Sequence, residues 1–113
     1  MTRIIAFFNQ KGGTAKTTST LNVAAALAER GRRVLAFDLD PQASLTMATG
    51  VDVASLELSV YDLLIDEGLT IDAVVQQTTI PGVDLIPSHP DLAAAELELL
   101  NVLERERQLD YRL

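Results

Sequence analysis

A short stretch rich in glycine, lysine and threonine, residues 11–18, carries the side chains best suited to bind a phosphate group. Glycine lets successive main-chain N–H groups turn toward an anion, and the N-terminus of a following helix adds positive potential. The Lys16 ammonium suits the β- and γ-phosphates of a nucleotide, and the Thr17 hydroxyl suits Mg²⁺. We therefore predict a nucleotide-binding loop formed by Lys11, Gly12, Gly13, Thr14, Ala15, Lys16, Thr17 and Thr18.

The segments around this loop have the character of alternating strands and helices. Residues 3–8 are apolar and β-branched without alternation, which is typical of a central parallel strand covered on both faces. Residues 16–30 predict a helix that Gly31 ends, and residues 34–38 predict the next strand. This order favours an α/β fold with a right-handed crossover, a parallel sheet and ligands at the carboxyl ends of the strands.

The rest of the chain gives weaker patterns. We expect short helical turns and loops over residues 43–59, and short helices over residues 60–65 and 71–75. A last helix is expected to begin at Pro90, because proline suits the first helical position, and to carry an apolar stripe that includes Leu92, Leu99 and Leu103. His89 precedes it, and we interpret this histidine as a loop residue with no catalytic role.

Composition narrows the class of protein. The chain has 113 residues, 48% of them hydrophobic and 22% charged, which suits one small globular domain. It has no cysteine, so thiolate metal sites and disulfides are excluded. Neither a leader nor a bilayer-spanning apolar run is seen, and we expect a soluble, cytoplasmic protein. The net charge of −7 opposes nonspecific attraction to DNA phosphates.

The loop departs from the strict P-loop pattern, since Gln10 and Ala15 occupy its glycine positions. With its second lysine, Lys11, it resembles the deviant motif of the ParA/MinD family of Walker-type ATPases, closest to the Soj-like ParA branch. Residues 34–42, ending in Asp-Leu-Asp-Pro-Gln, are similar to that family's second strand and its signature. Residues 83–88 and 92–99 look like its third strand and the helix that follows.

The resemblance implies a P-loop NTPase fold and assigns roles to single residues. The cofactors would be ATP and Mg²⁺, with Lys16 on the phosphates and Lys11 reaching the partner's nucleotide across a dimer. Asp40 would position the attacking water, and Asp38 would lie near the Mg²⁺ shell beside Thr17. A simpler alternative for Asp40 is a strand-end turn with Pro41. A Cβ at Ala15 would cost about 1 kcal/mol if the position needed a positive φ, and our hypothesis is that the loop tolerates it.

The family resemblance also implies a function. Members bind Mg-ATP, dimerise, hydrolyse slowly and position cargo, which suggests plasmid or chromosome partition with a ParB-like partner at the nucleoid. Residues 1–113 would be the amino-terminal part of one such domain, ending before the Walker B strand and the surfaces for nonspecific DNA. Two alternatives stay open: a MinD-like or other cargo-positioning ATPase, although no membrane contact is expected here, and a nonhydrolysing nucleotide-binding or interaction module.

Overall fold

The structure is a computed structural model that describes residues 2–7 and 15–89. Helix α1 (Ala15–Glu29) confirms the helix predicted before Gly31. Gly31 has a φ of 80°, and two hydrogen bonds close the helix end, from Gly31 N to Ala28 O (3.0 Å) and from Arg32 N to Leu27 O (3.0 Å). This pair of bonds is a Schellman motif, in which the left-handed residue is usually glycine. The glycine therefore ends α1 in the way the sequence predicts.

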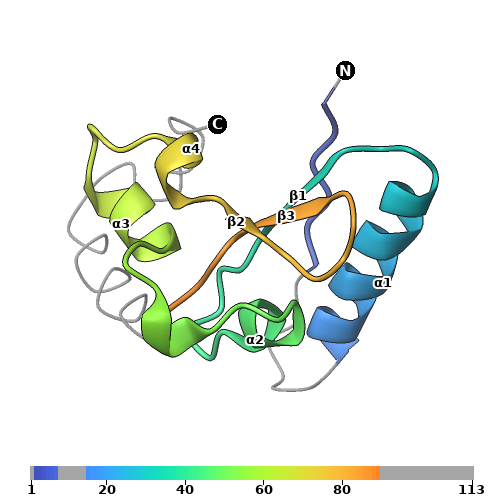
Figure 1. Cartoon of the computed structure of the whole chain (residues 1–113), viewed down its shortest axis with the longest axis horizontal. Helices are drawn as coiled ribbons and strands as arrows, with labels where there is room; N and C mark the ends of the chain where they lie inside the picture. Colours follow the sequence, from blue (N-terminus) through green and yellow to red (C-terminus); the bar gives the residue numbers. More distant parts are fainter. Residues whose placement is uncertain (1, 8–14, 90–113) are drawn as a thin grey trace.

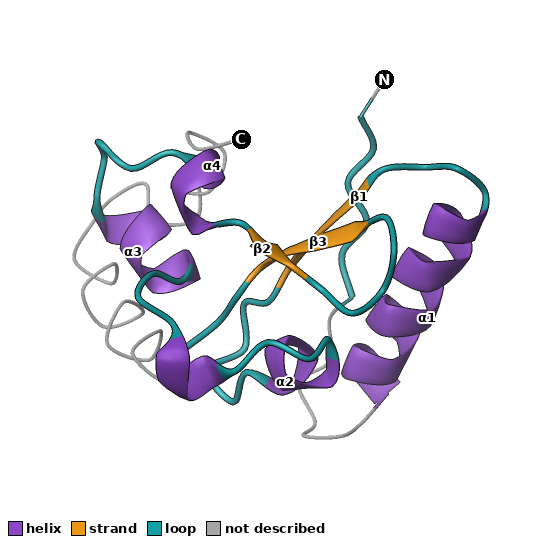
Figure 2. Cartoon of the chain, viewed as in Figure 1, coloured by secondary structure: helices purple, strands orange, loops and turns teal. Residues whose placement is uncertain are grey.

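A three-stranded sheet lies at the centre of the described residues, in the order β1-β3-β2 (Figure 2). Strand β1 (Val34–Phe37) pairs in parallel with β3 (Val83–Ile86), with Val34 opposite Val83 and Phe37 opposite Ile86. Both strands were predicted, and their parallel pairing is confirmed. Strand β2 (Gln76–Gln77) was not predicted, and it pairs with β3 in the antiparallel direction. The fold is α/β with a small mixed sheet.

Helices pack on both sides of this sheet (Figure 1). On one side, Val83 and Leu85 of β3 pack with Ala24 of α1 in a buried cluster. On the other side, Ile86 packs with residues of α3 (Val60–Ile65) and α4 (Ile71–Val74). Successive strand residues point to opposite faces, so a strand covered on both faces is apolar at neighbouring positions. The central strand β3 shows this at Leu85 and Ile86, both fully buried.

The connection between β1 and β3 contains short helices, as the sequence indicates, followed by β2. It contains α2 (Ser44–Ala48), the 3₁₀ turn η1 (Val53–Ser55), α3 and α4. Ser59 and Asp62 form a reciprocal capping box at the start of α3. The helix predicted from Pro90 onward lies outside the described residues. Among the residues that the structure does describe, no helix has the length and apolar character needed to cross a membrane.

The prediction of a central strand over residues 3–8 is wrong for the part that can be compared. Residues 2–7 form no strand with β1, β2 or β3, and Phe8 lies outside the described residues. Ile4 and Ile5 are 77% and 59% exposed. Apolar, β-branched composition shows that a segment suits a strand, but a strand also needs a partner for its main-chain hydrogen bonds. The other described strands do not provide that partner.

Candidate functional site

The first turn of α1 places two of the predicted phosphate-binding side chains at a helix N-terminus. Lys16 and Thr17 are both partly buried there, and Thr18 is exposed. The first turn contains no acidic residue, so its positive end is not offset by a carboxylate of its own. Ala15 is the first helical residue and therefore needs no positive φ. Lys11, Gly12, Gly13 and Thr14 lie outside the described residues.

The loop after β1 provides a carboxylate that faces this helix end. Asp40 Oδ2 lies 3.8 Å from Lys16 Nζ, and the two side chains are 39% and 32% exposed. An ion pair this open to solvent contributes little to stability, typically below about 1 kcal/mol. The pair is therefore accessible to a ligand and easily rearranged by one.

Asp40 also organises the turn that follows it. Its main-chain oxygen accepts a hydrogen bond from Ala43 N (2.8 Å), and its Oδ1 accepts one from Gln42 N (3.0 Å). Pro41 stands at the second position of this turn, where its fixed φ is favourable. The strand-end turn that was the alternative for Asp40 is thus present. It leaves Oδ2 facing Lys16, so the two interpretations are compatible.

Asp38 is buried, and its carboxylate accepts three hydrogen bonds. Oδ2 accepts from Thr46 N (2.9 Å) and Thr46 Oγ1 (2.7 Å), and Oδ1 accepts from Asp40 N (3.2 Å). Thr46 N belongs to the third residue of α2, one of the helical N–H groups that need an outside acceptor. The N-cap residue is Ala43, with a φ of 56° and no capping side chain. Asp38 therefore caps α2 from the end of the neighbouring strand.

Removing this cap should destabilise the fold. We expect Asp38→Ala to lower the free energy of unfolding by about 2–4 kcal/mol, because the buried N–H and hydroxyl of Thr46 lose their acceptor. The matched control is Asp52→Ala, which removes an exposed cap from Ala54 N at the start of η1 and should cost much less. Urea unfolding of the full-length protein measures both. Equal losses in the two variants would contradict this role for Asp38.

Two buried hydroxyls connect the acidic loop to the end of β3. Thr46 Oγ1 accepts a hydrogen bond from Ser88 N (2.9 Å), and Ser88 Oγ donates to Asp40 O (2.6 Å). Sequence reasoning missed Ser88. The available signal was position, because Ser88 follows a strand parallel to β1 and so lies at the same edge of the sheet as Asp38.

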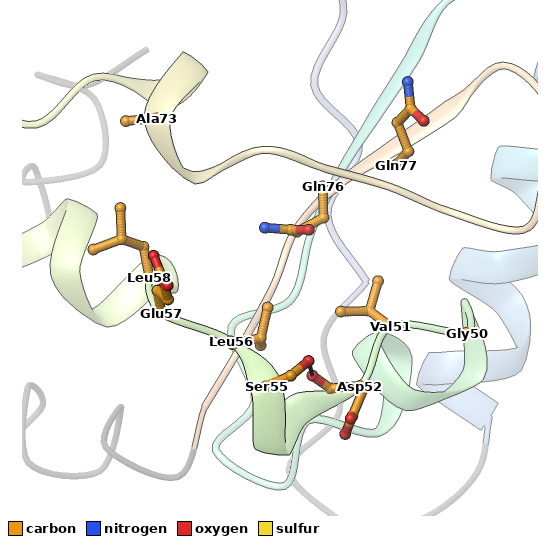
Figure 3. A pocket seen from close by; sticks show the side chains of 10 residues that line it. All are labelled: Gly50, Val51, Asp52, Ser55, Leu56, Glu57, Leu58, Ala73, Gln76 and Gln77. Atoms are coloured by element: carbon orange, nitrogen blue, oxygen red, sulfur yellow. Dashed lines mark hydrogen bonds between the residues drawn. The ribbon is translucent and has the colours of Figure 1, made fainter.

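A separate polar cavity of about 450 Å³ lies between the η1 region and β2 (Figure 3). Its lining comes from residues 50–52 and 55–58, Ala73, Gln76 and Gln77. Gln76 extends from β2 toward Leu56 and Leu58, whereas Gln77 points away from them (Figure 3). None of the lining residues is Lys16, Asp38 or Asp40. The cavity is therefore distinct from the site at α1.

The described residues contain no group of three or more histidine, cysteine, aspartate or glutamate side chains arranged to hold a metal ion. Mg²⁺ does not need such a group, because it commonly takes one or two protein oxygens and completes its shell with phosphates and water. The oxygens of Thr17 and Asp38 therefore fit this ion. Thr17 offers a hydroxyl at the helix end. Asp38 offers mainly Oδ1, since its Oδ2 already accepts two hydrogen bonds.

An α/β fold with a lysine-bearing helix end beside an acidic strand end is the arrangement expected of P-loop proteins, and comparison with known proteins gives the family. A family model described as an AAA domain, of the ParA/MinD type, matches residues 2–113. The chain belongs to this family.

Several relatives are similar over nearly the whole chain. The sporulation initiation inhibitor protein Soj of Bacillus subtilis is 45% identical over 96% of this chain and 43% of its own length. The chromosome partitioning protein ParA of Caulobacter vibrioides is 40% identical over 95% of this chain and 40% of its own. A crystal structure of cobyrinic acid a,c-diamide synthase from Mycobacterium smegmatis with bound ADP and magnesium superposes with a TM-score of 0.93. It is 45% identical and covers 99% of this chain and 45% of that one. The chain thus spans less than half the length of these relatives.

Proposed function

We propose that the protein carrying this chain binds Mg-ATP and hydrolyses it slowly, as a switch that positions a plasmid or a chromosome. The observation that carries the proposal is the meeting of Lys16 and Asp40 at 3.8 Å, on a helix N-terminus beside the carboxyl end of β1. This proximity supports a role for Lys16 in binding phosphate and a role for Asp40 in positioning water. The similarity to Soj and ParA supports partition as the process.

The phosphate groups would be held by the loop and by the first turn of α1. We assign the main-chain N–H groups from Lys11 to Ala15 to the phosphates, and Lys16 to the β- and γ-phosphates. Thr18 would donate to an α-phosphate oxygen, which its exposed position in the first turn permits. Binding replaces the weak contact of Lys16 with Asp40 by stronger contacts to a multiply charged phosphate chain.

We assign the Thr17 hydroxyl to Mg²⁺, with Asp38 near the metal shell through Oδ1. Bound Mg²⁺ would neutralise charge on the phosphate oxygens. The same Asp38 carboxylate caps α2, so it links any metal at the site to the conformation of the following helix. The magnesium in the similar Mycobacterium smegmatis structure supports this assignment.

Phosphoryl transfer to water requires mainly positioning and charge neutralisation from the protein. Asp40 Oδ2 faces the helix end and is exposed enough to accept a hydrogen bond from a water molecule. In the proposed reaction that water attacks the γ-phosphorus, the bond to the β,γ-bridging oxygen breaks with its electron pair passing to ADP, and ADP, phosphate and a proton from the water are released. Asp40 orients the water while Lys16 stabilises the charge on the transferred group.

Dimerisation would complete the site, with Lys11 acting on the nucleotide of the partner subunit. We propose an ATP-dependent homodimer in the cytoplasm, associated with the nucleoid and stimulated by a ParB-like partner. Nonspecific DNA would be bound by a region that corresponds to the part of the relatives outside their match to this chain. Residues 1–113 are poorly suited to it, because their net charge is −7. A MinD-like or other cargo-positioning ATPase is the alternative within the family.

The decisive experiment is a calorimetric Mg-ATP titration of the full-length protein, with phosphate release followed in parallel. Saturable binding together with turnover is expected. Binding without turnover would instead favour the nonhydrolysing nucleotide-binding module. Absence of binding by folded protein would contradict the whole proposal.

A further inference from the structure

Two completely buried side chains, Ser88 and Thr46, contact the segment that carries Asp38 and Asp40. Ser88 Oγ donates to the main-chain oxygen of Asp40 at 2.6 Å, and Thr46 Oγ1 bridges Ser88 N and Asp38 Oδ2 at 2.9 and 2.7 Å. Two hydroxyls therefore connect the ends of β1 and β3.

We propose that Ser88, supported by Thr46, is a positioning residue for the reaction at Asp40; this inference rests on the ATP hydrolysis proposed above. Ser88 does not touch the nucleotide. It fixes the main chain of Asp40 so that the carboxylate stays directed toward Lys16. Thr46 fixes Ser88 in turn, through the hydrogen bond to its main-chain nitrogen.

The contacts of Asp40 differ in what they can fix. The bond from its main-chain nitrogen to Asp38 Oδ1 (3.2 Å) links it only to the end of β1, two residues earlier in the chain. The bonds from Ala43 N and Gln42 N lie within the turn, so they set its shape. They do not set where the turn lies relative to α1. The contact with Lys16 is long and open to solvent, and a nucleotide would break it. The bond from Ser88 instead ties the turn to the central strand of the sheet.

Loss of this bond should therefore leave the turn formed but less well placed. A displacement of about 1 Å at a reacting group can reduce the rate by about a hundredfold. For Ser88→Ala we expect a fall in kcat of roughly ten- to a hundredfold. The dissociation constant for ADP should change by less than about threefold, since the hydrogen bonds described for Ser88 join it to Thr46 and Asp40 and not to α1.

A purely structural role for Ser88 makes a different prediction, and Thr78 provides the matched control. The Thr78 hydroxyl also donates to the main chain near the opposite end of β3, where its single proton is shared between Val83 O (2.7 Å) and Ile80 O (3.1 Å). Thr78→Val removes these bonds far from Asp40. If Ser88 only satisfies the main-chain carbonyl of Asp40, both variants lose stability and neither loses turnover selectively.

The experiment uses the full-length protein and measures kcat, KM, the ADP dissociation constant and urea unfolding for the wild type, Ser88→Ala and Thr78→Val. A selective loss of kcat in Ser88→Ala supports the inference. Equal kcat values in the two variants overturn it and leave the proposed ATPase function intact. A wild type that binds ATP without turnover overturns the proposed hydrolysis and this inference with it.

Thr46 gives a second test should Ser88→Ala fail to fold. Thr46→Val keeps the volume of the side chain and removes both hydroxyl bonds, whereas Thr46→Ser keeps the hydroxyl. The inference requires kcat to fall in Thr46→Val and to be restored in Thr46→Ser. A Thr46→Val protein that is folded and turns over ATP at the wild-type rate overturns it.

Discussion

Replacing Lys16 by alanine should weaken Mg-ATP binding by roughly a hundredfold, because charge-assisted hydrogen bonds to the phosphates are lost. The same change removes the cation beside Asp40, leaving a carboxylate that repels the phosphate chain. Both effects act in the same direction. Calorimetric titration of the full-length protein with Mg-ATP measures the loss directly.

The control for Lys16→Ala is Arg30→Ala, which removes one positive charge just beyond the other end of α1. Fourteen rises of 1.5 Å separate the ends of this helix, so the control charge lies about 20 Å away, beyond the screening length of about 8 Å at physiological salt. Affinity should hardly change in Arg30→Ala. Comparable losses in the two variants would show that Lys16 acts only through the overall charge.

Replacing Asp40 by asparagine should separate turnover from binding. We expect kcat to fall by at least about a hundredfold, because an amide is a much poorer acceptor for orienting a water molecule. ATP binding should be unchanged or up to about tenfold tighter, since Lys16 is released and a negative charge near the phosphates is removed. Asparagine keeps the side-chain oxygen that accepts from Gln42 N, so the turn should still form.

Asp66→Asn is the matched control for Asp40→Asn. Asp66 is exposed and accepts an equivalent hydrogen bond, from Gly68 N at 3.0 Å, in the turn after α3. Single-turnover phosphate release and equilibrium ATP binding distinguish the two variants. If Asp40→Asn hydrolyses ATP as fast as Asp66→Asn, Asp40 does not position the water.

Local patterns in the sequence predicted those elements whose signals lie within a few residues. Gly31 marks the end of α1 because a left-handed residue is needed there, and apolar runs mark β1 and β3. The short helices over 60–65 and 71–75 were also predicted. In each case, the residues that form the element also carry the signal for it.

Features that depend on partners distant in sequence were not predictable in this way. Residues 3–7 have the composition of a strand without a partner in the described sheet, and Gln76–Gln77 pair with β3 although two glutamines give no apolar pattern. In the candidate site, too, contacts between residues distant in sequence were not predicted. Lys16 and Asp40 were recognised from their motifs, but the capping of α2 by Asp38 and the bond from Ser88 require knowledge of which strand ends meet.

The hydrogen bonds of Ser88 have a consequence for the order of folding. They join residues 42 and 48 positions apart in the chain, so loops of that length must close before either bond can form. Contacts of such long range arise only after β3 has docked beside β1, whereas α1 and the capped turns can form locally. We expect main-chain amide protection at Ser88 to appear late in refolding, after that of α1. The placement of Asp40 by Ser88 is thus acquired only when β1 and β3 have paired.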